Sequence, residues 1–311
     1  MEWKAVVALL ASFILPIVCN QLKNPHNFNY ILNNPDICRE EIDFLIWVHS
    51  GPANYRRRIA LRETWANPKN MPNFPTGLAT AKVVFFLGAI RNDTIQRRIV
   101  FESEVYQDIV QEDYIDNYRN LTYKAMSGLK WIDKHCKSNQ IKIILKTDDD
   151  MMIFTDRLQR HLQSMTGFPT RPVTNTIICD VWVNRKVERT AGMKWSVSKD
   201  EFSRDRYPTY CPGLALLMTP DLVHKLWIKA LETQYFWVDD VFFTGLLVEN
   251  LNVTWVQMGS LFHFGGALLP KTFVKDPSNF IFGHVFSYRT DLFYYLWRRV
   301  NPSQDVIYHP F

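Results

Sequence analysis

The chain has 311 residues, of which 47% are hydrophobic and 14% aromatic, and its formal net charge is +5. This length allows one large domain or two small ones, and the composition supports a sizeable packed core. Basic residues form no long tract or stripe, so no nucleic-acid partner is expected.

The N-terminus indicates the compartment. Residues Ala5–Cys19 are apolar and polar residues follow them. This run is shorter than the ~20 residues that span a bilayer. It fits the apolar region of a signal peptide, or equally a short uncleaved signal anchor. We expect residues 1–19 to be this signal anchor or signal peptide, which directs the chain into the secretory pathway, and residues 20–42 to be a short stem.

Sequons and cysteines agree with a luminal location. Three Asn-x-Thr sequons begin at Asn92, Asn120 and Asn252 and are candidate N-glycosylation sites. Four cysteines beyond the apolar segment allow two disulfides in an oxidising lumen. Their spacing matches no zinc pattern, and the three possible pairings stay open for Cys38, Cys136, Cys179 and Cys211.

Strands and helices are expected to alternate in the first half of the chain. The apolar patterns predict strands at residues 44–49, 82–87 and 141–145, and helices at residues 55–65, 94–106 and 120–135. Such alternation is typical of an α/β domain with a mostly parallel sheet. Neither a Gly-x-Gly-x-x-Gly motif nor a phosphate-loop motif is present, so a dinucleotide site is not expected.

The second half is less regular. Strands are expected at residues 176–183 and 194–197, a loop at 207–213, and helices at 220–231 and 241–249. The loop follows from its two prolines, which interrupt a strand ladder or a helix. One continuous catalytic domain over residues 43–311 is the simplest account.

Three consecutive carboxylates follow the apolar run that ends at Leu145. Asp148, Asp149 and Asp150 are placed there at the end of a predicted strand, where open α/β sheets bind ligands. A hard divalent cation would relieve their mutual repulsion and could hold a diphosphate. A solvated acidic turn is the alternative, and the triplet alone does not choose between them.

Five ordered blocks resemble the β1,3-glycosyltransferases, which include β1,3-galactosyltransferases and β1,3-N-acetylglucosaminyltransferases. The blocks are Arg58–Trp65, Asp113–Lys124, the Asp triplet, the Tyr207–Gly213 loop, and Val238–Val241 with Gly245. The resemblance extends from about Phe44 to about Trp297. It implies a single Rossmann-like nucleotide-sugar transferase domain of the GT-A type, with a central, mostly parallel sheet.

The resemblance also implies an activity. The chain would be an inverting β1,3-hexosyltransferase that moves galactose from UDP-galactose to the 3-hydroxyl of an acceptor glycan on a glycoprotein or glycolipid. UDP-N-acetylglucosamine is the alternative donor, and a catalytically silent luminal glycan-binding protein or folding partner is the alternative from another class. The expected location is the Golgi membrane, as a single-pass type II protein, or the lumen and the outside of the cell if the N-terminal segment is cleaved.

Metal ligands can be assigned by the same resemblance. The triplet resembles the Asp-x-Asp motif that holds Mn²⁺, with Asp150 as the direct ligand and Asp148 on the same side of an extended segment. His284 is the predicted third ligand, because it precedes an aromatic segment like that of the family's last block. His263 in Leu261–Gly266 is its rival.

Three basic residues are candidates for the donor site, with Asp148 and Asp149. Arg58 and Arg62 are four residues apart, so they share a helix face that could grip a phosphate; ion pairs with Glu63 or other acids are the alternative. Lys124 follows Asn120 by one turn and could face the donor, while Asn120 itself could cap its helix. Ala125 replaces the family's Thr.

Proton transfer is assigned to a second acidic pair. Asp239 and Asp240 follow an aromatic run, and a partly apolar pocket raises the pKa of a carboxyl group and favours proton acceptance. We expect Asp240 to be the general base, with Asp239 beside it; a helix N-cap is an alternative that does not exclude this role. The acceptor side is assigned to Tyr207, Tyr210 and Trp237.

Overall fold

The computed structural model describes residues 22–67, 80–166, 173–264, 271, 280–285 and 289–301. The predicted apolar segment Ala5–Cys19 lies outside these residues. Among the residues described, no helix combines the length and the hydrophobicity that crossing a membrane requires.

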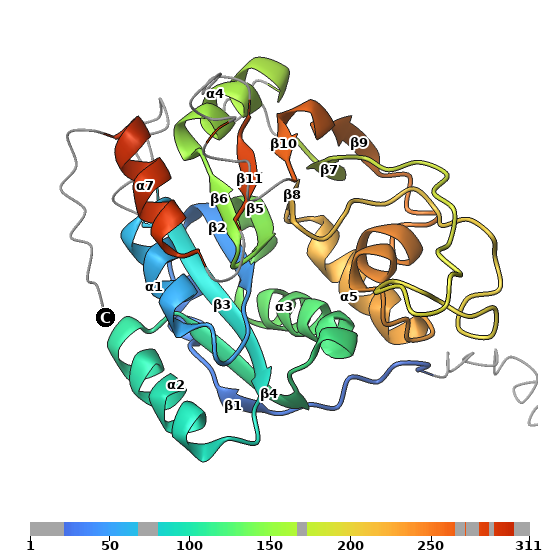
Figure 1. Ribbon diagram of the computed structural model, residues 1–311, viewed down its shortest axis with the longest axis horizontal. Helices are drawn as coiled ribbons and strands as arrows, with labels where there is room; N and C mark the ends of the chain where they lie inside the picture. Colours follow the sequence, from blue (N-terminus) through green and yellow to red (C-terminus); the bar gives the residue numbers. More distant parts are fainter. Residues whose placement is uncertain are drawn as a thin grey trace, which may run out of the picture.

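A central sheet organises the domain (Figure 1). Its eight described strands lie in the order β1-β4-β3-β2-β5-β8-β7-β9. They are β1 (Tyr30–Leu32), β2 (Ile42–His49), β3 (Ala81–Ala89), β4 (Ile109–Ile115), β5 (Ile141–Asp148), β7 (Thr176–Cys179), β8 (Ala215–Met218) and β9 (Thr254–Gln257). Strands β4, β3, β2 and β5 pair in parallel, as do β7 and β9, whereas β1 and β8 pair antiparallel with their neighbours. This confirms the predicted α/β class with a mostly parallel sheet.

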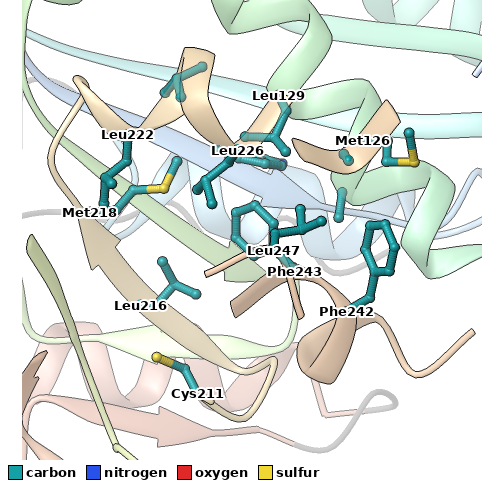
Figure 2. Packing of buried hydrophobic residues seen from close by; sticks show 14 of the residues in the cluster. Met126, Leu129, Cys211, Leu216, Met218, Leu222, Leu226, Phe242, Phe243 and Leu247 are labelled. Atoms are coloured by element: carbon teal, nitrogen blue, oxygen red, sulfur yellow. The ribbon is translucent and has the colours of Figure 1, made fainter. Parts of the chain in front are cut away.

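Helices cover both faces of this sheet. They are α1 (Tyr55–Glu63), α2 (Asp93–Tyr106), α3 (Leu121–His135), α4 (Thr155–Thr166), α5 (Leu222–Glu232) and α7 (Asp291–Val300), with 3-10 turns at Pro35–Cys38, Tyr118–Asn120, Ser138–Gln140 and Gly259–Leu261 and a π-helix at Val241–Leu246. Strand β2 is buried throughout. Its Leu45 and Trp47 join the core under α3 and α5, and Phe44 and Ile46 join the core under α1, α4 and α7. Figure 2 shows the first core, where Leu226 of α5 and Phe243 lie beside Leu129 of α3.

A smaller sheet continues from the acidic triplet. It has the order β10-β11-β6, from β10 (Phe262–His263), β11 (Phe282–His284) and β6 (Met151–Ile153). Strand β6 begins directly after Asp150 and pairs antiparallel with β11, so that His284 lies opposite Met151. The backbone N–H of Val285 also donates to the carbonyl of Asp150. The chain therefore brings the end of the triplet next to His284.

Some predicted elements differ from the observed ones. The segment 194–197 is not a strand. The Arg189 side chain donates to the carbonyls of Val197 and Ser198 at 2.7 and 2.6 Å, which in a sheet would accept from a neighbouring strand. The predicted strand 176–183 ends at Cys179, and the predicted helix 241–249 is the π-helix followed by turns. Strands β1 and β4 were not predicted.

The segment predicted as a stem contributes to the domain in its described part. Strand β1 pairs with β4, and a disulfide joins Cys38 to Cys136 at the end of α3. His26 and Glu112 form a buried pair at 2.7 Å. The packed domain therefore begins before the predicted boundary at residue 43. The second disulfide joins Cys179 to Cys211, which resolves the pairing that the sequence left open.

Candidate active site

The acidic triplet lies at the carboxyl edge of the sheet, as predicted. Asp148 ends β5 and pairs in register with His49, the last residue of β2. Strand β8 is antiparallel to both β5 and β7, and β9 is parallel to β7. The carboxyl ends of β2, β5, β7 and β9 therefore lie at one edge, where open α/β sheets bind ligands.

Asp149 points into the protein. Its carboxylate, which is almost fully buried, accepts hydrogen bonds from Ser50 Oγ at 2.7 Å, Asn54 Nδ2 at 2.9 Å and Arg57 Nη1 at 2.5 Å. These donors satisfy it and tie the triplet to the start of α1. The predicted donor-binding role of Asp149 is therefore replaced by a structural one.

Asp150 and His284 meet, as the metal-site prediction requires. His284 Nε2 lies 3.5 Å from Asp150 Oδ2, and Asp150 Oδ1 is buried with no hydrogen-bond partner among the described residues. The side-chain hydrogen bond with Asp150 raises the pKa of His284. Arg57 Nη1 is 3.6 Å from Asp150 Oδ2.

The rival histidine lies on the other face of the small sheet. His263 is in register with Gly283, one residue before His284, while Phe262 and Phe282 stack at 4.3 Å. Side chains alternate along strands, so residues in register share a face and the next residue lies on the opposite one. Asp150 lies in the turn before β6, and its contact with His284 Nε2 at 3.5 Å identifies His284 as the preferred ligand.

The residues present suit a divalent cation in part. Among the described residues no group of three or more His, Cys, Asp or Glu side chains is placed to hold a metal. Asp150 and His284 still offer an oxygen and a nitrogen donor, which Mn²⁺ accepts, and Asp150 Oδ1 lacks any other partner. Asp148, the other predicted ligand, lies 3.6 Å from Lys146. Two protein ligands fit a cation whose shell is completed by phosphate oxygens and water.

Lys146 is a central residue of the site that the sequence analysis missed. Its buried Nζ donates to the carbonyl of Gly213 at 2.9 Å and lies 3.6 Å from Asp148 Oδ1. Burial raises the pKa of Asp148 to about 7, which the charge of Lys146 opposes. His49, 3.9 Å from Asp148, is fully buried, and its pKa is well below the usual value because of burial and the charges of Lys146 and Lys124. The signal in the sequence that could have identified Lys146 is the presence of a lysine within a largely apolar strand.

Asp239 and Asp240 lie next to Gly213, whose carbonyl accepts from Lys146. Burial and the neighbouring Asp239 charge raise the pKa of Asp240 to about 7. Burial also raises the pKa of Asp239, against the charge of Lys146. Asp240 accepts from the N–H of Val241 at 2.8 Å and caps the π-helix. The predicted cap and the raised pKa that suits a base therefore belong to the same residue.

The predicted acceptor aromatics are less accessible than expected. Tyr207, Tyr210 and Trp237 are each more than 90% buried, and Trp237 Nε1 donates to Glu201 Oε1 at 3.0 Å. They form a wall rather than a free stacking surface. The exposed rings here are those of Tyr118 and Trp195, joined by a hydrogen bond from Trp195 Nε1 to Tyr118 Oη at 2.7 Å.

Tyr118 is close to the acidic residues of the site. Burial raises its pKa to about 12, and the charges of Asp239, Asp240 and Asp148 add to this rise. Its ring centroid lies 6.5 Å from that of Trp237. The sequence analysis did not single out Tyr118, although it falls inside the Asp113–Lys124 block.

Arg58 and Arg62 are engaged by acidic side chains of the protein. Arg58, fully buried, donates to both carboxylate oxygens of Glu102 at 2.8 and 2.6 Å, and Arg62 binds Glu102 and Asp108 at 2.7 Å each. The predicted shared face exists, but it joins α1 to α2 and to the start of β4. Ion pairs form, as in the alternative, but they are buried rather than on a solvated surface, and their partners are Glu102 and Asp108 rather than Glu63.

Lys124 is likewise engaged inside the protein. Its Nζ lies 2.8 Å from Asp116 Oδ2 and donates to the carbonyl of Ser50 at 2.6 Å. Ser50 also donates to Asp149. Lys124 therefore supports the segment at Ser50, which holds Asp149 of the triplet. Arg57, which was not predicted, is the arginine that reaches the triplet.

Two of the three sequons are exposed. Asn92 caps α2 by accepting from the N–H of Ile95 at 3.1 Å. Asn252 lies in a turn with positive φ. Asn120 occupies the cap position of α3 without capping it, because its side chain donates to the carbonyl of Ile115 at 2.8 Å. The predicted cap at Asn120 is therefore wrong.

Comparison with known proteins places this site in a family. Residues 56–259 match the family model described as Galactosyltransferase. The chain is 28% identical to beta-1,3-galactosyltransferase 1 of Homo sapiens over 242 residues, which cover 78% of this chain and 71% of the relative. It is 31% identical to human beta-1,3-galactosyltransferase 2 over 234 residues, or 74% of this chain and 53% of that protein.

Solved structures give more distant similarities. Mouse xyloside xylosyltransferase 1 in its apo form aligns with a TM-score of 0.36 at 12% identity, covering 78% of this chain and 96% of that one. The glycosyltransferase GlyE of Streptococcus pneumoniae aligns with a TM-score of 0.37 at 10% identity, covering 82% and 60%. By the family match over most of its catalytic region, the chain belongs to the galactosyltransferase family of glycosyltransferases.

Proposed function

We propose that this protein is an inverting β1,3-hexosyltransferase that transfers galactose from UDP-galactose to the 3-hydroxyl of an acceptor glycan on a glycoprotein or glycolipid. The observation that carries the proposal is the presence of two acidic groups that both feel the charge of Lys146. One is the triplet, whose Asp150 lies 3.5 Å from His284, and the other holds Asp240, whose pKa is raised to about 7. We assign the first group to the leaving diphosphate and the second to proton transfer.

Asp240 is the proposed general base. A base works best when its pKa is near the operating pH, because it is then partly ionised and still accepts a proton. The acceptor oxygen attacks the anomeric carbon of the donor while its proton passes to Asp240. The bond to the UDP oxygen breaks in the same step, so the configuration inverts and no glycosyl-enzyme forms. The charge of Lys146 keeps a fraction of the Asp240 carboxyl ionised.

Asp150 and His284 are the proposed ligands of Mn²⁺. When bound there, the cation would neutralise charge on the departing diphosphate. The residues of the chain prepare this place: β6 and β11 hold Asp150 against His284, and Arg57 adds a positive charge 3.6 Å from Asp150. Asp149 fixes Arg57 in turn.

Tyr118 and Trp195 are proposed as the acceptor platform. Both are exposed, at 44% and 54%, and they are hydrogen-bonded to each other near the Asp239–Asp240 pair. Aromatic faces pack well against the apolar faces of sugars. The buried Trp237, whose ring centroid lies 6.5 Å from that of Tyr118, supports this surface.

We also propose a luminal location, in the Golgi, with the chain held as a type II membrane protein by its N-terminal segment or released after cleavage. The two disulfides suit an oxidising compartment, and Asn92 and Asn252 are exposed sequons. Mass spectrometry of the mature N-terminus distinguishes an anchor from a cleaved peptide.

A donor screen tests the activity. Purified full chain is assayed with a panel of UDP-sugars and β-linked acceptors, with Mn²⁺ or with EDTA. The expected result is metal-supported transfer from UDP-galactose, in a 1,3 linkage, which Asp240→Asn abolishes while UDP binding persists. Transfer from UDP-N-acetylglucosamine would correct the donor. Absence of transfer and of UDP-sugar hydrolysis across the panel would favour a silent glycan-binding protein.

A further inference from the structure

A surface pocket lies next to the ends of β7 and β9. It has a volume of about 630 Å³ and an open mouth. The chain between β7 and β8 supplies most of its lining, and Figure 1 shows this yellow segment at the side of the molecule away from α2. The lining residues are Asp180, Val181, Trp182, Val183, Asn184, Arg185, Lys186, Arg206 and Gln257.

Three exposed cations line this pocket without ionic partners. Among the described residues, no carboxylate lies within 4 Å of the charged nitrogens of Arg185, Lys186 or Arg206, whereas neighbouring Arg204 and Lys199 are both ion-paired. The one acid in the lining, Asp180, already accepts from Trp182 Nε1 at 2.6 Å. The three cations outnumber this single acid, so the lining carries a net positive charge.

Trp182 and Arg185 form a flat wall of the pocket. The guanidinium carbon of Arg185 lies 4.3 Å from the centroid of the Trp182 ring, and that ring packs edge-on against Tyr210 at 5.7 Å. A stacked guanidinium keeps its in-plane N–H donors available for an anion. An aromatic wall with cationic donors is suited to a sugar that carries an acidic group.

The pocket is joined to the active site by backbone. Trp182 pairs with Tyr210, and Lys186 pairs with Arg206, in a short irregular ribbon. Tyr210 precedes Gly213, whose carbonyl accepts from Lys146 in the centre of the active site. The two sites therefore share one structural unit.

The pocket also lies at the same edge of the sheet as the acidic triplet. Asp180 and Gln257 end or follow β7 and β9, whose carboxyl ends lie at the edge where β5 ends in Asp148. Strands are about 4.8 Å apart, so β7 is about 10 Å and β9 about 14 Å from β5. A short oligosaccharide spans such a distance.

We propose that this pocket binds an acidic group, a carboxylate or a sulfate ester, on the acceptor glycan, at a sugar beyond the one that receives the transferred hexose. The proposal rests on the proposed transferase function, because it names the acceptor class of that enzyme. Arg185 and Lys186 supply the charge, and Arg206, which donates to the carbonyl of Asn184 at 2.6 Å, fixes the turn that presents them.

Direct binding tests this without turnover. Titration calorimetry on the full chain compares three versions of one short oligosaccharide, with a neutral hexose, a hexuronic acid or a sulfated hexose at its non-reacting end. We expect at least one acidic version to bind about tenfold more tightly than the neutral one, and the preference to fall with added salt. The two acidic versions distinguish carboxylate from sulfate.

Matched variants locate the effect. Arg185→Gln with Lys186→Gln should remove the preference for the acidic version, and Lys186→Glu should weaken it. Arg97→Gln with Arg98→Gln removes the same charge from the exposed surface of α2, at the opposite side of the sheet, and should leave the preference intact. Thermal unfolding of each variant confirms that it is folded.

The outcomes separate this inference from the proposed function. Equal affinity for all three oligosaccharides, or a preference that survives loss of Arg185 and Lys186, overturns the pocket assignment even if transfer proceeds normally. A charge preference that disappears in the pocket variants, in a protein without transfer activity, supports the pocket and rejects the enzyme.

Discussion

His284 Nε2 lies 3.5 Å from Asp150 Oδ2 because β11 and β6 pair antiparallel, with His284 opposite Met151. The two side chains place an oxygen and a nitrogen metal ligand next to each other. Asp150 Oδ1 has no hydrogen-bond partner among the described residues. We predict that His284→Ala weakens Mn²⁺ binding in the presence of UDP by about 10- to 100-fold. Titration calorimetry or electron paramagnetic resonance of Mn²⁺ measures this affinity.

His263→Ala is the matched control for this change. His263 is in register with Gly283, the residue before His284, and so lies on the other face of the small sheet from His284. We expect its Mn²⁺ affinity to stay near that of the natural protein. Loss of Mn²⁺ binding in His263→Ala, with binding retained in His284→Ala, would reverse the ligand assignment.

The pH dependence of transfer should report Asp240. Burial and Asp239 raise its pKa to about 7, and a general base acts only when deprotonated. We therefore predict that kcat/KM rises with pH through about 7, with a slope near one, and levels off above it. Asp240→Asn should abolish transfer at every pH, whereas UDP affinity changes little. A flat profile from pH 5 to 9 would contradict the base assignment.

Lys146→Met tests the cation between the two acidic groups. The charge of Lys146 opposes the rise in the pKa of Asp148, Asp239 and Asp240. Its removal should raise the pKa of Asp240, so the rising limb of the kcat/KM profile should move to higher pH. The residual activity at pH 8 to 9 should then exceed that at pH 7. An unchanged limb in a folded variant would show that Lys146 does not act on the base.

The acidic residues of the candidate site could be identified from the sequence. Asp148, Asp150 and Asp240 stand in motif blocks, and the structure brings Asp150 to His284. The basic residues were harder, because a spacing of four identifies a shared helix face but not what that face meets. Arg58 meets Glu102, and its ion pair depends on how α1 packs against α2.

The fold was predictable where apolar patterns are strong. Strand β4 was missed because buried Gln111 and Glu112 break the apolar pattern. Their partners come from distant segments: Gln111 donates to Gln96, and Glu112 binds His26 and Lys130. No local pattern contains these contacts, and β1 was missed for the same reason, since it exists through its pairing with β4.

The variant Arg58→Met tests whether Arg58 has a structural role or binds the donor. Removing one partner of a buried ion pair costs about 3–5 kcal/mol, so Arg58→Met should lower the free energy of unfolding by about that amount in urea. In Arg58→Met the buried Glu102 keeps Arg62 as its one remaining partner. In the double change Arg58→Met with Glu102→Leu that carboxylate is gone and Arg62 still pairs with Asp108, so the double change should cost less. UDP affinity of the folded protein should change little. A large loss of UDP affinity with unaltered stability would restore the donor-binding role.

The disulfide Cys179–Cys211 should matter for the acceptor more than for the donor. It links the end of β7 to the Tyr207–Gly213 loop, so it fixes both ends of the ribbon that carries the basic pocket. Replacing both cysteines with serine should cost about 4 kcal/mol from loop entropy. It should also raise the acceptor KM several-fold, with UDP affinity nearly unchanged.

The Cys38–Cys136 disulfide provides the comparison. It closes a longer loop, with a sequence separation of 98 against 32, so its loss should cost slightly more stability, about 5 kcal/mol. It joins the end of α3 to the segment before β2, away from the ribbon, and so the acceptor KM of its double-serine variant should stay unchanged. Urea unfolding and acceptor kinetics on the two variants measure both effects. If both variants raised the acceptor KM equally, the effect would reflect general destabilisation, and the ribbon would have no specific role in holding the acceptor.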